Sequence, residues 1–341
     1  MAIPDTARDH DARAVFVLDA IAAASQMRGL MARAAAQKMT DQNSRPQARS
    51  DRWAAILMRL GWSRTGSAND HANRATPKRE AILYYSHFRS PAVLRELARL
   101  RAELGSRFDI FAVGYCQTAG ALDGIDCVPA LEYSADDLRS LPYRNKISRF
   151  NPGNFIGNAD LVPMKFFLER PAYDYYWIIE YDVRFSGAWP ALFTDLSSSD
   201  ADLLCTALQT WAENPNWAHW STLVTGGEDV PLERRVKGFM PFCRVSRALF
   251  AACDARYRRG WSGHPEVTWP TIAILAGLRL EDIGGNGCFT PAERRGRYYQ
   301  NTASEWSLFP GTFVYRPSFA DRNLFGPQCH FSGTLWHPVK E

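Results

Sequence analysis

The sequence lacks several patterns that would each indicate a particular class of protein. Its seven cysteines among 341 residues include no Cys-x-x-Cys pair and no other metal-ligand spacing, so neither a disulfide framework nor a cysteine-bound metal is expected. The longest apolar runs, such as 14–18 and 271–278, are too short to span a membrane. The Gly-rich loops of dinucleotide-binding and P-loop proteins are missing, as is the Gly-x-Ser-x-Gly elbow of hydrolases.

The whole chain carries only a small excess of positive charge, and this excess is unevenly distributed along the sequence. The 40 Lys and Arg against 36 Asp and Glu leave a net charge of +4, too little to indicate a nucleic-acid partner. Residues 1–79 hold 13 basic and 7 acidic residues, a net of +6, whereas residues 80–341 hold 27 and 29, a net of −2. The sequence therefore predicts a basic helical extension with a linker over 1–79 and a separate domain over 80–341.

The extension has the composition of two helices and a linker. Residues 12–39 are rich in Ala with Arg and Met, 51–62 place apolar residues at helical spacing, and 63–79 are polar. The acidic residues near the start are unlike a secretory signal, which favours a cytoplasmic protein. Two interpretations stay open for the basic helices: packing on the main domain or partial disorder, or peripheral contact with an anionic membrane surface.

From residue 80 onwards, short apolar runs alternate with helical stretches, as is typical of an α/β domain. Strands are expected over 81–85, 108–115 and 125–131, and helices are expected after the first strand as far as residue 104 and over 159–169. Residues 175–179 are continuously hydrophobic, which predicts a strand buried on both faces of a central sheet.

This buried strand ends in two carboxylates, Glu180 and Asp182, separated by one residue. In a continuing strand both side chains would point to the same side, and two neighbouring acids disfavour each other's ionisation unless a cation neutralises them. A divalent metal ion bound to the oxygens of a diphosphate would be such a cation. The alternative is a strand end in solvent, with Arg184 pairing one acid.

The segment from Glu180 to Trp189 resembles the Asp-x-Asp motif of GT-A glycosyltransferases in a Glu-x-Asp form. The resemblance extends to the order of elements over about 80–341, with further matching stretches at 237–250, 260–269 and 334–340. It implies a GT-A-like, Rossmann-like fold from a bacterial branch of the superfamily, with a central mixed sheet flanked by helices. It also implies transfer of a sugar from a nucleotide-diphosphate donor to a glycan or lipid-linked acceptor, as in polysaccharide biosynthesis.

The resemblance implies a metal site made by Glu180, Asp182 and His337, with Asp182 as a direct ligand of Mn²⁺ or Mg²⁺. Lys340, three residues after His337, is a candidate contact for the donor diphosphate, either beside the metal or in a metal-independent enzyme. A solvated side chain is the equally weighted alternative for Lys340.

The resemblance also implies a catalytic acid and acceptor contacts. Glu266 would act as the general base of an inverting transfer, although an acid in a first helical turn is favourable without any catalytic role. His264 would contact the acceptor or orient Glu266, or it is simply structural. Trp217 and Trp220 lie in a turn-rich segment and would either stack on acceptor sugar rings or fill the core.

The donor is expected at the loop after the first strand, where open α/β sheets place ligands. Ser86, His87 and Arg89 lie in this loop. Asp160 and Lys165 belong to the helix before the acidic strand, where the superfamily contacts the donor ribose and sugar. Structural alternatives are an exposed loop arginine, an acid near a helix N-cap and a surface lysine.

Two other classes of function stay open. A nucleotidyltransferase-type nucleotide-sugar enzyme shares the α/β layout, but it usually carries a Gly-rich loop after the first strand, which residues 86–90 lack. A non-catalytic protein that binds nucleotides or carbohydrates on a degenerate transferase fold would be expected to have lost one of the site residues. The paired acids, Glu266 and His337 are all present.

Overall fold

A computed structural model describes residues 78–153, 155–301, 311–316, 318–320 and 332–340. The helices expected over 12–39 and 51–62, and the linker up to residue 77, lie outside these ranges. Within the ranges, no helix combines the length and the apolar character needed to cross a lipid bilayer.

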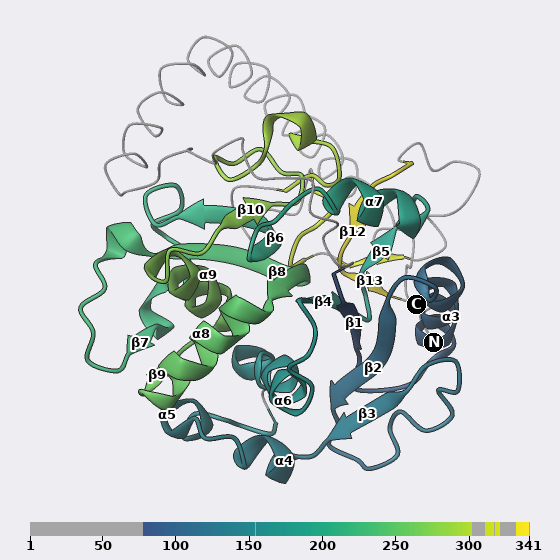
Figure 1. The fold of residues 1–341 in the computed structure, drawn as a ribbon, viewed down its shortest axis with the longest axis horizontal. Coiled ribbons are helices and arrows are strands. Elements are labelled where there is room, and N and C mark those ends of the chain that lie inside the picture. Colours follow the sequence, from purple (N-terminus) through teal and green to yellow (C-terminus); the bar gives the residue numbers. More distant parts are fainter. Residues whose placement is uncertain (1–77, 154, 302–310, 317, 321–331, 341) are drawn as a thin grey trace, which may run out of the picture. The chain divides into compact units, whose positions relative to one another are not determined.

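A seven-stranded mixed sheet lies at the centre of the described residues (Figure 1). In spatial order its strands are β10 (Leu280–Asp282), β6 (Leu203–Thr210), β8 (Val236–Ser246), β4 (Tyr175–Glu180), β1 (Glu80–Tyr85), β2 (Asp109–Tyr115) and β3 (Ala130–Tyr133). Within this sheet β8 is antiparallel to both of its neighbours, and the other pairs are parallel. The structure confirms the expected α/β class with a central mixed sheet.

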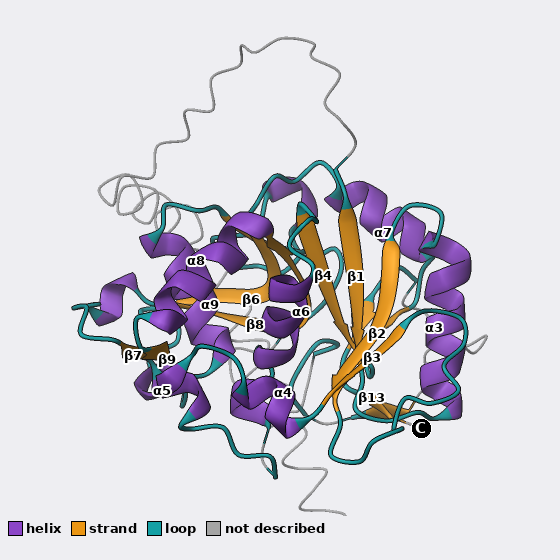
Figure 2. Ribbon diagram, turned by 60° about the horizontal axis from the view of Figure 1, so that its bottom comes forward, coloured by secondary structure: helices purple, strands orange, loops and turns teal. Residues whose placement is uncertain are grey.

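Helices cover both faces of this sheet (Figure 2). Tyr176 and Trp177 of β4 point to opposite faces because side chains alternate along a strand, and both are buried, which explains the continuous hydrophobic run. Trp177 packs with α3 (Pro91–Leu104) and α7 (Trp189–Leu196). The core around Tyr176 includes α6 (Leu161–Glu169), α8 (Arg247–Arg258) and α9 (Pro265–Leu275).

Serine side chains set the starts of two of these helices. Ser90 accepts a hydrogen bond from the backbone amide of Val93 at the first turn of α3, where Pro91 occupies a position that needs no amide donor. Ser246 caps α8 in the same way through the amide of Leu249.

The direction in which strands are added to the sheet reverses between β1 and β4. From β1 it passes through α3 to β2 and β3 on one side, and then through α4 (Ala135–Arg139), α5 (Arg144–Ile147), η1 (Ile156–Asn158) and α6 to β4 on the other side. β1 and β4 are parallel, with Tyr85 opposite Glu180 at their carboxyl ends. Open α/β sheets bind ligands at such a switch point, so the acidic end of β4 lies where a ligand is expected.

The C-terminal residues are tied to the chain just after β4. β12 (Leu335–Trp336) pairs antiparallel with β5 (Arg184–Phe185), and β13 (Val339–Lys340) pairs with β11 (Phe319–Ala320). The amide of Val339 donates a 2.8 Å hydrogen bond to the carbonyl oxygen of Asp182. These contacts bring His337 and Lys340 to the carboxyl end of β4.

The third strand differs from the expected 125–131, because β3 begins at Ala130. Ile125 and Val128 are loop residues, each 6% exposed, that pack in the same core as α3. Their apolar character therefore reflects burial and not a strand. The remaining short elements are β7 (Val224–Thr225), its partner β9 (Trp261–Ser262), η2 (Trp220–Thr222), η3 (Leu232–Arg234) and η4 (Ala292–Arg294).

Candidate metal and donor site

A tight turn directly after β4 brings the two acids together. β4 ends at Glu180, so Asp182 does not continue the strand as the sequence pattern assumed. The buried guanidinium of Arg184 donates hydrogen bonds to the carbonyl oxygens of Tyr181 (2.7 Å) and Val183 (2.9 Å) and fixes the turn from inside. The position of Asp182 is thus set by buried backbone contacts.

His337 completes a cluster with these acids. Its Nε2 lies 3.7 Å from Oε2 of Glu180 and 3.5 Å from Oδ1 of Asp182, and ligand atoms of all three residues lie within 4.8 Å of one another. Its Nδ1 lies 2.8 Å from the carbonyl oxygen of Val314, which accepts the Nδ1 proton. This contact fixes the ring and turns Nε2 toward the carboxylates, as in many metal-binding histidines.

The charged groups of this cluster stabilise one another's ionised forms. Burial alone would raise the pKa of Asp182, but the neighbouring His337 and Lys340 lower it to about 2. Burial likewise opposes protonation of His337, yet its interactions with the carboxylates of Asp182 and Glu180 raise its pKa to about 9. Without a bound cation, an imidazolium at Nε2 therefore neutralises the acids.

The cluster fits a divalent metal ion. Oδ1 of Asp182 is buried, yet it accepts no hydrogen bond from any residue that the structure describes. A bound cation would satisfy this oxygen and replace the proton on His337 Nε2. Two carboxylates and one imidazole are a donor set that Mn²⁺ accepts readily and Mg²⁺ less so.

Lys340 and His87 also lie at this cluster. The Lys340 ammonium donates to Oδ2 of Asp182 and to the hydroxyl oxygen of Tyr181, both at 2.6 Å. Burial and the charge of Lys340 lower the pKa of His87, while Asp182 and Glu180 oppose that shift. The ring of His87 meets that of Tyr181 edge-on, 5.4 Å between centroids. The structure thus places the loop after β1 beside the acids.

Other residues of the expected donor set take structural positions. Ser86 is fully buried, and its hydroxyl donates to the carbonyl oxygen of Phe88 at 2.7 Å. The guanidinium of Arg89 packs against Gly124, where a Cβ atom would lie 2.1 Å from it. Asp160 is buried in an ion pair of 2.8 Å with Lys146. Lys165 pairs with Glu169 one helical turn away, at 3.3 Å. Asp160 precedes α6 but makes no side-chain hydrogen bond that caps it, unlike the alternative considered from the sequence.

The residues expected at the acceptor side lie around the start of α9. His264 is the N-cap, and its Nδ1 accepts a 3.4 Å hydrogen bond from the amide of Glu266. Burial, with smaller contributions from His219 and Lys146, lowers the pKa of His264 to about 3, so its imidazole is neutral. The carboxylate of Glu266 lies 3.9 Å from His264 Nδ1.

Trp217 and Trp220 are only 5% exposed and pack in the core beside α8 and α9. Trp220 donates its indole hydrogen to the carbonyl oxygen of Asn214 at 2.8 Å. Both side chains therefore fill the core, which is the alternative expected for most aromatic residues.

Sequence reasoning missed two residues near this site. Tyr181, which touches Lys340 and His87, stands between the paired acids, and its position there was the available signal. Lys146 is 1% exposed in the short helix α5, and nothing in its local sequence distinguishes it from a surface lysine.

No protein-family model and no curated protein sequence matches the chain. Solved structures similar to it include glycosyltransferases. Core-mannan synthase A from Aspergillus fumigatus, in a Mn/GDP form, is 13% identical with a TM-score of 0.30, covering 63% of this chain and 74% of that one. The galactosyltransferase LgtC, with donor and acceptor sugar analogues, is 9% identical with a TM-score of 0.37, covering 59% and 73%.

A third similar structure belongs to the other enzyme class considered from the sequence. It is a Bacillus anthracis protein provisionally named as a glucose-1-phosphate thymidylyltransferase, 11% identical with a TM-score of 0.35, covering 60% of this chain and 85% of that one. Similarities of this strength assign no reaction and no ligand to this chain.

Proposed function

We propose that the protein is a metal-assisted glycosyltransferase that uses a nucleotide-diphosphate sugar donor. The observation that carries this proposal is the convergence of Glu180, Asp182 and His337 at the carboxyl ends of β1 and β4, with a buried Asp182 oxygen that accepts no hydrogen bond from the described part of the chain. This set of oxygen and nitrogen atoms suits a divalent ion that also binds a diphosphate.

In this proposal the bond between the anomeric carbon and the diphosphate oxygen breaks, and a bond from the acceptor oxygen to that carbon forms. A divalent ion would act as a Lewis acid on the leaving nucleoside diphosphate. Glu180, Asp182 and His337 would hold that ion, and the ammonium of Lys340 would supply a further positive charge for the leaving group. The phenol ring of Tyr181 and the imidazole of His87 would line the donor site.

Glu266 is the proposed general base, which takes the proton of the acceptor hydroxyl as the new bond forms and makes the transfer inverting. Its support is local: Glu266 lies in the first turn of α9, and its carboxylate is 3.9 Å from the neutral imidazole of His264. The acceptor class, a glycan or lipid-linked hydroxyl, belongs to the proposal. The cytoplasmic location and peripheral membrane contact of 1–79 stay predictions.

Ligand binding is tested by thermal unfolding with a panel of nucleoside diphosphates and nucleotide sugars, with and without Mn²⁺. A ligand at 100 times its Kd stabilises the protein by about 2.7 kcal/mol, a Tm rise of about 5–10 °C for a domain of this size. Stabilisation that needs both nucleotide and Mn²⁺ in the wild type, and that is absent in Asp182→Asn, is expected. No stabilisation by any nucleotide would contradict the proposal.

Product analysis separates the alternatives. A glycosyltransferase releases a nucleoside diphosphate from its sugar donor, whereas a nucleotidyltransferase consumes a nucleoside triphosphate and releases pyrophosphate. A non-catalytic binding protein would be stabilised by nucleotide and release neither product. Only nucleoside diphosphate release that depends on Mn²⁺ and on Glu266 supports the proposal.

A further inference from the structure

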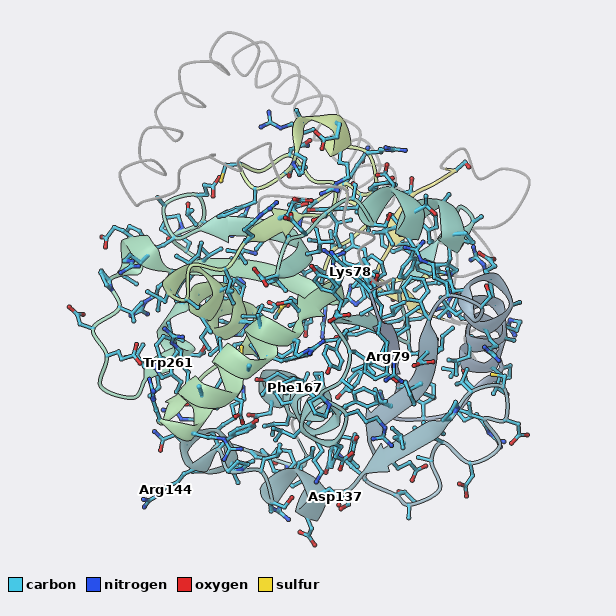
Figure 3. All side chains as sticks on the ribbon, in the orientation of Figure 1. Lys78, Arg79, Asp137, Arg144, Phe167 and Trp261 are labelled. Atoms are coloured by element: carbon cyan, nitrogen blue, oxygen red, sulfur yellow. The ribbon has the colours of Figure 1, made fainter. Side chains whose placement is uncertain are left out.

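Lys146 occupies an unusual place for a lysine. It lies on α5, the four-residue helix that starts at Arg144 (Figure 3), yet the side chain is 1% exposed. Lysine is almost never fully buried unless its charge is paired. Burial lowers the pKa of Lys146, while Asp160 opposes that shift.

The ammonium of Lys146 has one ion-pair partner and two hydrogen-bond acceptors, which lie on separate segments. Its Nζ lies 2.8 Å from Oδ1 of Asp160, 2.6 Å from the carbonyl oxygen of Gly263 and 3.4 Å from that of Gly157. The charge of the ammonium is thus paired with Asp160, and two of its three donors are used by backbone carbonyl oxygens. Gly263 lies three residues before Glu266, so Lys146 holds the chain that enters the first turn of α9.

Asp160 is linked to α9 at a residue that follows Glu266 in the sequence. Its Oδ2 accepts a 2.6 Å hydrogen bond from the hydroxyl of Tyr257, and that hydroxyl accepts a 3.0 Å hydrogen bond from the indole of Trp269. Trp269 lies three residues after Glu266 and is 2% exposed. The Lys146–Asp160 pair is therefore linked to the chain before Glu266 directly, at Gly263, and to the chain after it through Tyr257.

A buried ion pair is weak support for stability, because the cost of removing both charges from water offsets their attraction. We propose that the Lys146–Asp160 pair is a positioning device that holds Glu266 at a fixed place relative to α6 and hence to the acidic end of β4. This inference rests on the proposed role of Glu266 as the base, and Lys146 acts through Gly263 without touching substrate.

The test compares three variants of the full chain with the wild type. Lys146→Met leaves the Asp160 carboxylate buried and unpaired, so it is expected to unfold at a lower temperature. Lys146→Met/Asp160→Asn removes both charges and keeps an oxygen for Tyr257, so its Tm should return to within about 3 °C of wild type. Arg139→Met removes one charge of the exposed Arg139–Asp136 ion pair on α4 and serves as the control.

Two readouts distinguish positioning from stability alone. In the double variant we expect kcat for sugar transfer to fall about 100-fold, as for a misplacement of about 1 Å, with the affinity for Mn²⁺ and nucleoside diphosphate unchanged. We also expect amide hydrogen exchange in residues 263–268 to be about tenfold faster, with β1 and β4 unaffected. Arg139→Met should change neither readout.

A double variant with wild-type kcat and wild-type exchange in 263–268 would overturn the inference. If the wild type transfers no sugar, the proposed function fails by itself, and the exchange measurement still decides whether the ion pair holds this segment. Unchanged exchange in that case also overturns the inference.

Discussion

Two buried aspartates lie at carboxyl ends of strands in the same sheet, and their surroundings differ. Asp282, at the end of β10, is 1% exposed and accepts hydrogen bonds only from neutral groups among the described residues, the amides of Leu208, Gly284 and Gly285 and the hydroxyl of Tyr299, at 2.8–3.1 Å. Asp182, after β4, is 5% exposed and meets two cationic side chains, His337 and Lys340.

The pKa directions of the two acids show the consequence. Burial raises the pKa of Asp282, and its hydrogen bonds oppose that shift only in part. For Asp182 the neighbouring cations overcome burial and lower the pKa to about 2. Asp282 is an acid whose neutral donors are fixed parts of the fold. Asp182 is held ionised by side-chain cations, which a metal ion can replace.

The largest expected effect comes from Asp182→Asn. We expect turnover to fall about 100- to 1000-fold, because the amide weakens the hold on the metal that stabilises the leaving charge. Steady-state nucleoside diphosphate release measures this loss. A variant that retains Mn²⁺-dependent turnover near the wild-type rate would place the metal elsewhere.

His337→Gln should lower Mn²⁺ affinity about 10- to 100-fold. Because Mn²⁺ needs an unprotonated Nε2 and the pKa of His337 is raised to about 9, wild-type affinity should increase as pH rises from 6.5 to 9. In the metal-free protein, protonated His337 stabilises the fold fully below about pH 6.5, the ordinary histidine pKa, and this contribution is lost as pH rises through about 9. Titration calorimetry and thermal unfolding measure the two trends, and a pH slope that persists in the variant would assign it to another group.

Asp282→Asn should affect stability and leave metal binding unchanged. The new amide donor would face one of the amide or hydroxyl donors that now surround the carboxylate, leaving a buried donor unsatisfied at a cost of about 1–3 kcal/mol. Urea unfolding measures the loss, and Mn²⁺ titration of the same variant is its control. Weakened Mn²⁺ binding would remove the distinction between the two aspartates.

Lys340→Met should have the smallest effect. Its ammonium now pairs with Asp182, so its removal is expected to leave Mn²⁺ affinity unchanged or slightly higher. Affinity for the nucleoside diphosphate should fall about tenfold, as for the loss of one charged hydrogen bond. Equal loss of both affinities would mean that Lys340 serves only to shape the acidic turn.

Much of the fold was predictable because burial leaves a pattern in the chain. The continuous hydrophobic run of β4 and the alternation of strands with helices gave the α/β class and the central mixed sheet. The start of β3 was not predictable from the same signal, since Ile125 and Val128 are buried as loop residues. Apolar residues report burial without reporting backbone conformation.

The candidate site was predictable where chemistry is concentrated in a short motif. The acids at 180 and 182 stand out locally, and the structure brings His337 to them across the C-terminal contacts with β5. The partner of Asp160 was not predictable, because its pairing with Lys146 depends on how α5 packs against α6, whereas the i,i+4 spacing of Lys165 and Glu169 can be recognised in the sequence. Polar side chains on helices carry little local signal of what they face.

The proposed metal site is tested most directly by the Mn²⁺ stoichiometry of the wild type and of Asp182→Asn, each at the concentration of a nucleoside diphosphate that saturates the wild type. Electron paramagnetic resonance of free Mn²⁺ measures it in solution. The account predicts one bound Mn²⁺ per wild-type chain and none per Asp182→Asn chain at the same concentrations. One bound ion in both proteins, or none in the wild type, would contradict it.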